Sequence, residues 1–250
     1  MNPLKNRKKI KLFSALFRLL ILIPVLAHTQ TGFKVVNDYI DEETTLEGGT
    51  YIVQKNVKVT KDGVLIVNAG TEILFTAKTS VQIDGGLIIK GEANNFVHIS
   101  SLDLSNEGFG FIISSLDESE IKIHYTRFAD LIMPLKFSPQ WYRPKVEIKN
   151  NSFVENISGE SGIVINRPDE LLATSDIIFD FSKNIFANNT CNIYIYELES
   201  NVLKLNFTNN TIIDNTYKGF EMGGESNAPI YSFYNGSDKK FKAVFKNNVF

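Results

Sequence analysis

The feature that most constrains the fold of this chain is an internal repeat of about 22 residues. The segments VTKDGVLIVNAG (59–70) and VQIDGGLIIKG (81–91) align so that Gly63 falls on Gly85 and the apolar runs LIV and LII coincide. In both segments the apolar run is bounded by Gly, Asp, Asn or Lys, which is typical of a short β-strand between turns. A short repeat that holds about three such strands predicts a solenoid.

Other all-β architectures fit the sequence less well. A β-sandwich requires hairpin turns of the Asn-Gly kind, and the sequence has one such pair, Asn235-Gly236. A propeller requires a repeat of about 40 residues or more. No segment after residue 32 keeps a helical apolar period over three turns, so helices are not expected. The sequence therefore predicts an all-β parallel β-helix solenoid.

Five later segments support the same architecture, because they align on an apolar anchor in a motif close to NNxF. The anchors are Phe128, Phe153, Phe186, Ile212 and Phe250. The residues two positions before the anchor are Thr126, Asn151, Asn184, Asn210 and Asn248, and those three positions after it are Leu131, Asn156, Asn189 and Asn215. Coils of a β-helix stack about 4.8 Å apart, so these columns predict internal apolar stacks and asparagine ladders at the turns.

The N-terminus has the pattern of a secretory signal peptide. A basic stretch at 5–11 precedes a mostly apolar stretch at 12–27, which ends in small residues. The apolar run is shorter than the roughly 20 residues that a membrane span needs, so we expect no membrane span after cleavage and a secreted or cell-surface location. The predicted division is a signal peptide over 1–27, a linker and N-terminal cap over 28–48, and a β-helix over 49–250. The sequence ends within a coil motif, and we expect the β-helix to continue beyond residue 250 or the sequence to be a fragment.

The segment EGGTYIVQKNVKVTKDGVLIVNAG (47–70), with the later NNSF, KNIFANN and NNTIIDN motifs, resembles the right-handed parallel β-helix proteins of the pectin-lyase-like superfamily. The resemblance covers about residues 32–250 and implies a right-handed solenoid. The length of this region corresponds to about nine coils of roughly 24 residues. The resemblance does not fix the activity, because this scaffold carries lyases, hydrolases, esterases, epimerases and inert adhesins.

Composition and motifs favour a binding or structural role over catalysis. The net charge of −2 gives no field for nucleic acid, and none of the motifs NTDG, DD and HG that we associate with enzymes of the family is present. We therefore expect a secreted or cell-surface module for carbohydrate binding, adhesion or structure, with an extracellular polysaccharide or surface protein as partner. The alternative is a polysaccharide lyase or glycoside hydrolase that acts on acidic polysaccharide.

Carboxylates supply the weak catalytic candidates for that alternative. Asp130, Glu155 and Asp214 share the column two positions after the anchor, as catalytic carboxylates of adjacent coils would. No cofactor is expected, but Asp130 and Glu155 would lie on neighbouring coils and form a weak candidate site for Ca²⁺. The competing interpretation is a solvated acidic stripe beside the turn.

Other polar residues give little indication of chemistry. Lys122 and Glu147 are expected to form an ion pair between coils. His98 and His124 are expected to face outward, and the sequence shows no acid and nucleophile to accompany either one.

Aromatic residues supply the candidate carbohydrate-binding positions. In NIYIYE (192–197) the alternation predicts that Tyr194 and Tyr196 face outward, where they could stack on sugar rings. Trp141, Tyr142 and Arg143 form the tip of a proline-containing insertion and are predicted to contact carbohydrate or protein. In the competing interpretation, Trp141 folds down onto the β-helix as a lid.

Overall fold

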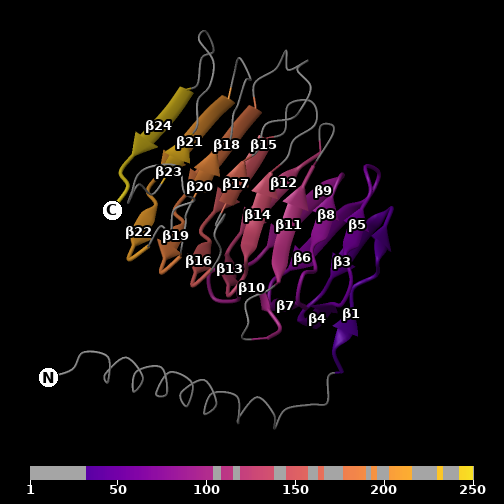
Figure 1. The fold of residues 1–250 in the computed structure, drawn as a ribbon. Coiled ribbons are helices and arrows are strands. Elements are labelled where there is room, and N and C mark those ends of the chain that lie inside the picture. The colour runs from indigo at the N-terminus through magenta and orange to yellow at the C-terminus, as the bar shows by residue number, and fades with distance from the viewer. Residues whose placement is uncertain are drawn as a thin grey trace, which may run out of the picture. The chain divides into compact units, whose positions relative to one another are not determined.

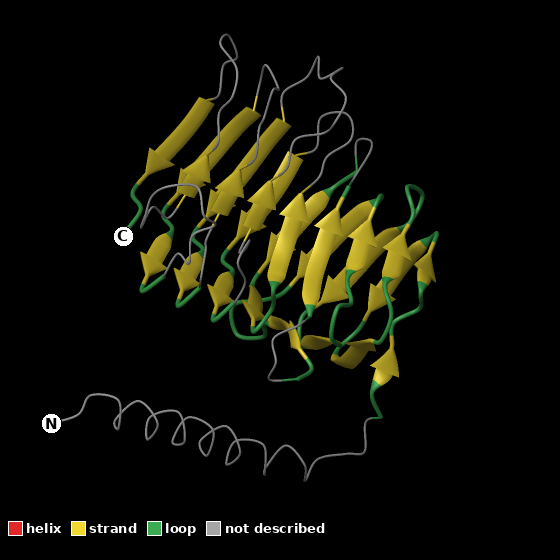
Figure 2. Cartoon of the chain, viewed as in Figure 1, coloured by secondary structure: helices red, strands yellow, loops and turns green. Residues whose placement is uncertain are grey.

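The computed structural model describes residues 32–103, 108–114, 119–137, 145–156, 163–165, 177–189, 193–195, 203–215, 230–232 and 242–249. All regular secondary structure in these ranges is β-strand (Figure 2). The chain divides into two units, Met1–Gly32 and Phe33–Phe250, and every strand belongs to the second unit. The predicted signal peptide over 1–27 lies outside the described residues.

The strands form three parallel sheets, and consecutive strands belong to different sheets (Figure 1). Sheet A contains β1 (Lys34–Val35), β4 (Gly49–Val53), β7 (Thr71–Phe75), β10 (Val97–Ser101), β13 (Thr126–Ala129), β16 (Ser152–Val154), β19 (Ile185–Ala187) and β22 (Thr211–Ile213). Sheet B contains β2 (Tyr39–Ile40), β5 (Val57–Val59), β8 (Val81–Ile83), β11 (Phe109–Ile113), β14 (Met133–Phe137), β17 (Ile163–Ile165), β20 (Ile193–Ile195) and β23 (Ile230–Ser232). Sheet C contains β3 (Glu43–Leu46), β6 (Val64–Asn68), β9 (Gly86–Lys90), β12 (Ile121–His124), β15 (Lys145–Lys149), β18 (Ile177–Ser182), β21 (Leu203–Thr208) and β24 (Lys242–Lys246).

This topology confirms the predicted all-β class and fits a parallel β-helix solenoid. We call three consecutive strands, one in each sheet, a coil. Each sheet has eight strands among the described residues, and the expected total of about nine coils stays a prediction. The segment predicted as a cap over 28–48 contains β1, β2 and β3, which pair with β4, β5 and β6 of the next coil.

The strand register places the predicted columns directly on top of one another. In sheet C, Ile148 pairs with Phe181, and Phe181 pairs with Phe207. These three side chains are 0%, 0% and 1% exposed, so they form one buried file. In the N-terminal repeat, Leu65 lies opposite Leu87, as the alignment of the two segments predicts.

The repeated glycine of the N-terminal segments has a steric cause. A Cβ atom added to Gly85 would lie 2.1 Å from the Gly63 carbonyl oxygen, and one added to Gly63 would lie 2.4 Å from the Ile40 carbonyl oxygen. Successive turns therefore approach each other so closely that a side chain does not fit between them. The 22-residue spacing marks the distance along the chain from one such contact to the next.

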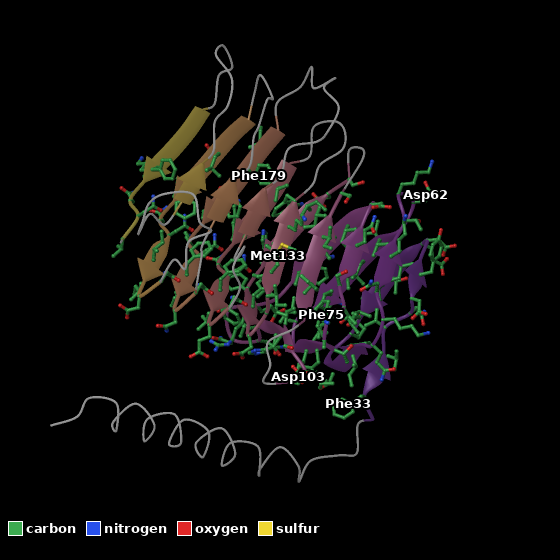
Figure 3. All side chains as sticks on the ribbon, viewed as in Figure 1. Phe33, Asp62, Phe75, Asp103, Met133 and Phe179 are labelled. Atoms are coloured by element: carbon green, nitrogen blue, oxygen red, sulfur yellow. The ribbon has the colours of Figure 1, made fainter. Side chains whose placement is uncertain are left out.

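Phenylalanine fills the interior of the later coils. The rings of Phe128 and Phe153 stack with centroids 4.9 Å apart, and those of Phe153 and Phe186 with centroids 5.0 Å apart, in the spacing that favours aromatic pairs. Buried Phe75 and Phe179 lie among the strands in Figure 3, whereas exposed Asp62 lies at the margin. The anchor column of the sequence motif is thus an aromatic stack from Phe128 to Phe186, and Ile212 continues it in the next coil.

Both predicted asparagine ladders are present. In the first, the backbone N–H of Asn151 donates to Asn184 Oδ1 at 3.0 Å, and that of Asn184 donates to Asn210 Oδ1 at 2.8 Å. In the second, the backbone N–H of Asn156 donates to Asn189 Oδ1 at 3.1 Å. Each of these side chains is buried, so the amides provide hydrogen bonds that water cannot supply at these turns.

Candidate binding groove

A hollow of about 710 Å³ opens on the outer face of sheet A, over β10, β13, β16 and β19. These four strands are neighbours in the sheet, so the hollow runs across successive coils. Its lining combines two aromatic rings, several amides, two permanently charged bases and a few aliphatic side chains. We call this hollow the sheet-A groove.

The segment 91–96 forms one wall of the sheet-A groove. It connects β9 to β10, at a corner where one residue is enough to connect β12 to β13. Glu92 and Asn95 exchange two backbone hydrogen bonds, of 3.1 and 3.0 Å, which close the segment into a tight turn. The Asn95 side chain lies against Gly70, where an added Cβ would come within 3.0 Å of Asn95 Oδ1. The wall is therefore seated on the coil before it.

Tyr125 supplies an aromatic ring to the groove from a backbone conformation that tyrosine rarely adopts. Its φ is 47°, in the left-handed region. The equivalent corner positions of later coils also have positive φ and are occupied by Asn150, Lys183, Asn209 and Asn247. Asparagine tolerates this region, whereas a bulky residue there is an outlier that costs free energy. The Tyr125 ring contacts Phe96 edge to face, with centroids 5.9 Å apart.

His98 and Arg127 reach the groove because strand residues alternate between two faces. They lie opposite each other on β10 and β13. Their chain neighbours Val97, Ile99 and Phe128 are fully buried, so the side chains of His98 and Arg127 project outward. Ser152 and Ile185 continue the same file on β16 and β19.

The described lining of the groove contains basic side chains, and one carboxylate, that of Glu72, lies next to His98 outside the lining. Desolvation of the His98 ring lowers the pKa of this imidazole, and although the Glu72 carboxylate raises it, the Arg127 guanidinium lowers it further. His98 is therefore neutral at pH 7, and the fixed charges of the lining come from Arg127 and Lys183. None of the described residues that line the groove is a carboxylate.

The three predicted carboxylates lie at another corner of the coil, and their positions have a backbone cause. Asp130, Glu155 and Asp214 have φ values of 56°, 57° and 50°, and Asn188 of the same column has 55°. Asp and Asn are the residues that most readily adopt this conformation, which explains much of the acidic column without catalysis. Asp130 and Glu155 follow paired strands of adjacent coils, as predicted, and neither they nor Asp214 lines the groove.

Their expected metal and catalytic roles stay predictions. Within the described ranges, no group of three or more His, Cys, Asp and Glu side chains is placed to hold a metal ion.

The predicted aromatic positions are only partly covered by the described residues. Tyr194 lies at the centre of β20, in register with Val164 of β17 and Tyr231 of β23. Trp141, Tyr142, Arg143 and Tyr196 lie outside the described residues. Their roles in carbohydrate binding stay predictions.

A second polar cluster lies on the outer face of sheet C, and its pairing differs from the expected one. Lys122 is in register with Glu147, as predicted, but its ammonium group pairs with Glu120. Glu147 instead receives the Lys149 ammonium at 3.0 Å on one oxygen and has His124 Nε2 at 2.7 Å from the other.

The cluster shifts the pKa values of two of its members. Burial raises the pKa of Glu147, but the ammonium group of Lys149 and the charge of His124 outweigh burial, so the pKa lies below its ordinary value. Burial lowers the pKa of Lys149, but Glu147 and Asp180 more than compensate and raise it. The pair itself lies within β15, and β15 is linked to its neighbours by the contact of Glu147 with His124 of β12 and by that of Lys149 with Asp180 of β18, at 3.6 Å.

Comparison of the chain with protein-family models, with curated proteins and with solved structures finds no match. Within the described residues there is no helix with the length and apolar character to cross a membrane.

Sequence reasoning missed Phe96, Tyr125 and Arg127. A signal for Tyr125 was available, because it interrupts the corner column that is otherwise occupied by Asn150, Lys183, Asn209 and Asn247. The contact between Tyr125 and Phe96 depends on how the segment 91–96 folds, which no periodicity in the sequence indicates.

Proposed function

We propose that the chain is an exported, right-handed parallel β-helix of the pectin-lyase-like type that binds carbohydrate. The three parallel sheets with their glycine contacts and asparagine ladders support the architecture. The N-terminal pattern of a signal peptide supports export to a secreted or cell-surface location. The partner is an extracellular polysaccharide or a glycan on a surface protein.

The observation that carries the binding function is the position of Tyr125. A left-handed tyrosine costs about 1–2 kcal/mol relative to an ordinary backbone conformation, and such strain is concentrated at functional sites. The ring stands with Phe96 at the groove, where the side chains of Asn94 and Asn150 also lie. Sugar rings are bound in this way, with the apolar ring face on an aromatic side chain and the hydroxyl groups on amides.

The variant Tyr125→Asn separates binding from folding, because asparagine is the residue that later coils place at this corner. We expect its free energy of unfolding to change by less than about 1 kcal/mol, since relief of backbone strain offsets the lost contact with Phe96. We expect its retardation in affinity gels that contain the bound polysaccharide to fall by about tenfold or more.

The control is Tyr39→Asn, which removes a tyrosine that is 60% exposed on β2 in sheet B. This variant should be retarded like the unmodified chain. Equal retardation of all three proteins would remove the groove from the proposal, and no retardation by any polysaccharide would remove carbohydrate binding.

The enzymatic alternative, a lyase or hydrolase of acidic polysaccharide with Asp130, Glu155 and Asp214, is tested by the same polysaccharides. Incubation with and without Ca²⁺ should give neither new reducing ends nor unsaturated products if the chain is a binding module. Products that disappear in Asp130→Asn or Glu155→Gln would establish the alternative.

A further inference from the structure

We infer that the sheet-A groove selects a negatively charged sugar, one that carries a carboxylate or a sulfate group. This inference rests on the proposed function of the groove and names its ligand class. It uses the charges of the lining, which the proposal of carbohydrate binding does not need.

The two fixed cations of the groove come from different coils. Arg127 lies on β13, and Lys183 lies at the corner that leads into β19. Since only β16 separates β13 from β19, the backbones of these strands lie about 10 Å apart. A saccharide of more than one ring can therefore meet both cations while its ring faces lie near Tyr125.

The groove cations share one hollow with no acidic side chain in its described lining. Within the described residues no ion pair joins Arg127 or Lys183 to a carboxylate, whereas Lys58 pairs with Asp84 at 2.9 Å. Lysines such as Lys61 and Lys136 also have no such pair there, so it is the position of Arg127 and Lys183 beside the hollow that distinguishes them. Two cations beside one hollow can receive a negative group from outside the chain.

Neutral His98 adds a specific hydrogen-bonding site between these charges. Its lowered pKa leaves the imidazole uncharged at pH 7, so the ring can accept as well as donate a hydrogen bond. This suits a sugar hydroxyl group beside the acidic group. General attraction to polyanions does not account for the same preference, because the chain carries a net charge of −2.

The test compares each anionic polymer with a neutral one of the same backbone. Polygalacturonate is paired with its carboxyl-reduced form, and dextran sulfate with dextran, in affinity gels at two salt concentrations. In one of the two pairs, we expect the anionic polymer to retard the chain at least about tenfold more than the neutral polymer does. This difference should become smaller at high salt. The pair that gives the effect identifies the carboxylate or the sulfate as the recognised group.

The variants Arg127→Gln and Lys183→Gln should each reduce this retardation by about tenfold. The matched control Lys55→Gln, which removes an exposed lysine that pairs with Asp38, should leave it unchanged. Thermal denaturation of each variant checks that the fold is intact.

Three outcomes would overturn the inference. If neutral and anionic polymers are retained equally and Tyr125→Asn abolishes both, the groove binds carbohydrate without regard to charge. If the anionic preference survives in both glutamine variants, another surface is responsible. If no polymer is retained, the proposed function and the inference are both overturned.

Discussion

The corner between sheet C and sheet A is built in two ways along the molecule. In the N-terminal coils the backbone makes the contact: the N–H of Gly49 donates to the Gly70 carbonyl at 3.2 Å, and the N–H of Val97 donates to the Tyr125 carbonyl at 3.1 Å. In the C-terminal coils a side chain makes it, as when the N–H of Asn210 donates to Asn248 Oδ1 at 2.9 Å. The change occurs at Thr126, whose N–H donates to Asn151 Oδ1.

The two kinds of corner differ in how much the number of residues in the corner can vary. The N-terminal corners contain two residues, at 47–48 and 69–70, or six residues, at 91–96. The asparagine corners that precede β16, β19 and β22 each contain two residues. A backbone contact can be made by corners of several lengths, whereas the asparagine must stand at one position to reach its neighbours. The wall of the groove, segment 91–96, accordingly belongs to the N-terminal coils, where corner length varies. Part of its floor, on β16 and β19, belongs to the coils with asparagine corners of constant length.

The largest effect is expected where the N-terminal coils leave no room for a side chain. Gly85→Ala places a Cβ atom 2.1 Å from the Gly63 carbonyl and 2.3 Å from the Thr60 carbonyl, so the backbone must move. We expect a loss of about 3 kcal/mol in the free energy of unfolding, measured by chemical denaturation.

Gly48→Ala is the matched control, because its nearest contacts lie at 4.0 Å. If both variants lose the same stability, close stacking is not the reason for the repeated glycine.

A smaller effect is expected from a broken ladder. Asn184→Ala removes the acceptor of the Asn151 N–H and the donor to the Ile148 carbonyl. These groups are left buried without partners, so we expect a loss of about 2 kcal/mol in the free energy of unfolding.

Thr71→Val tests the equivalent column in the N-terminal coils, where Val97 already occupies the next position. It should cost less than about 1 kcal/mol, because the one hydrogen bond that the Thr71 hydroxyl makes within the described residues is long, at 3.3 Å to the Leu46 carbonyl. Equal costs at Asn184 and Thr71 would show that the two kinds of corner are equally dependent on side chains.

The smallest effect concerns the ion cluster at the boundary between the two regions. The pKa of Glu147 lies below its ordinary value of 4.5, so its contribution to stability is complete above that pH and is lost as the pH falls through the lowered pKa. In thermal melts from pH 7 to pH 3, Glu147→Gln should lose less stability than the unmodified chain, by about 1 kcal/mol at most.

Glu43→Gln, which changes an exposed residue of β3, is the control for removing a carboxylate elsewhere. An acid sensitivity of Glu147→Gln equal to that of the unmodified chain would show that the cluster does not link the coils.

The features of the fold that could be predicted from the sequence are those that recur in every coil. The columns that contain Leu65 and Phe181 could be aligned from sequence because each coil places like residues at like positions. Position-specific features were not predictable in the same way. The partner of Glu147 is Lys149 on its own strand, because residues two positions apart share a face and their side chains can meet without crossing between strands.

The candidate site shows a second reason for failure. Asp130, Glu155 and Asp214 were grouped by charge, but the property that they share is a left-handed backbone, which a sequence records only indirectly. Tyr125 has the same backbone property in another column, and there the departure from asparagine is the basis of the proposed function. Residue type at a corner therefore has to be compared with what the local φ requires before it is assigned a chemical role.

The asparagine corner has a consequence for how a chain of this kind can change length. Asn184 accepts hydrogen bonds from Asn151 and offers its own N–H and Nδ2 to Asn210 in the same pattern. Each coil thus presents to its successor the same surface that it met in its predecessor. A duplication or deletion of one whole unit after β19 therefore leaves the asparagine hydrogen bonds of the remaining junctions in the same pattern, so this part of the chain can gain or lose units during evolution without change to the lining of the groove.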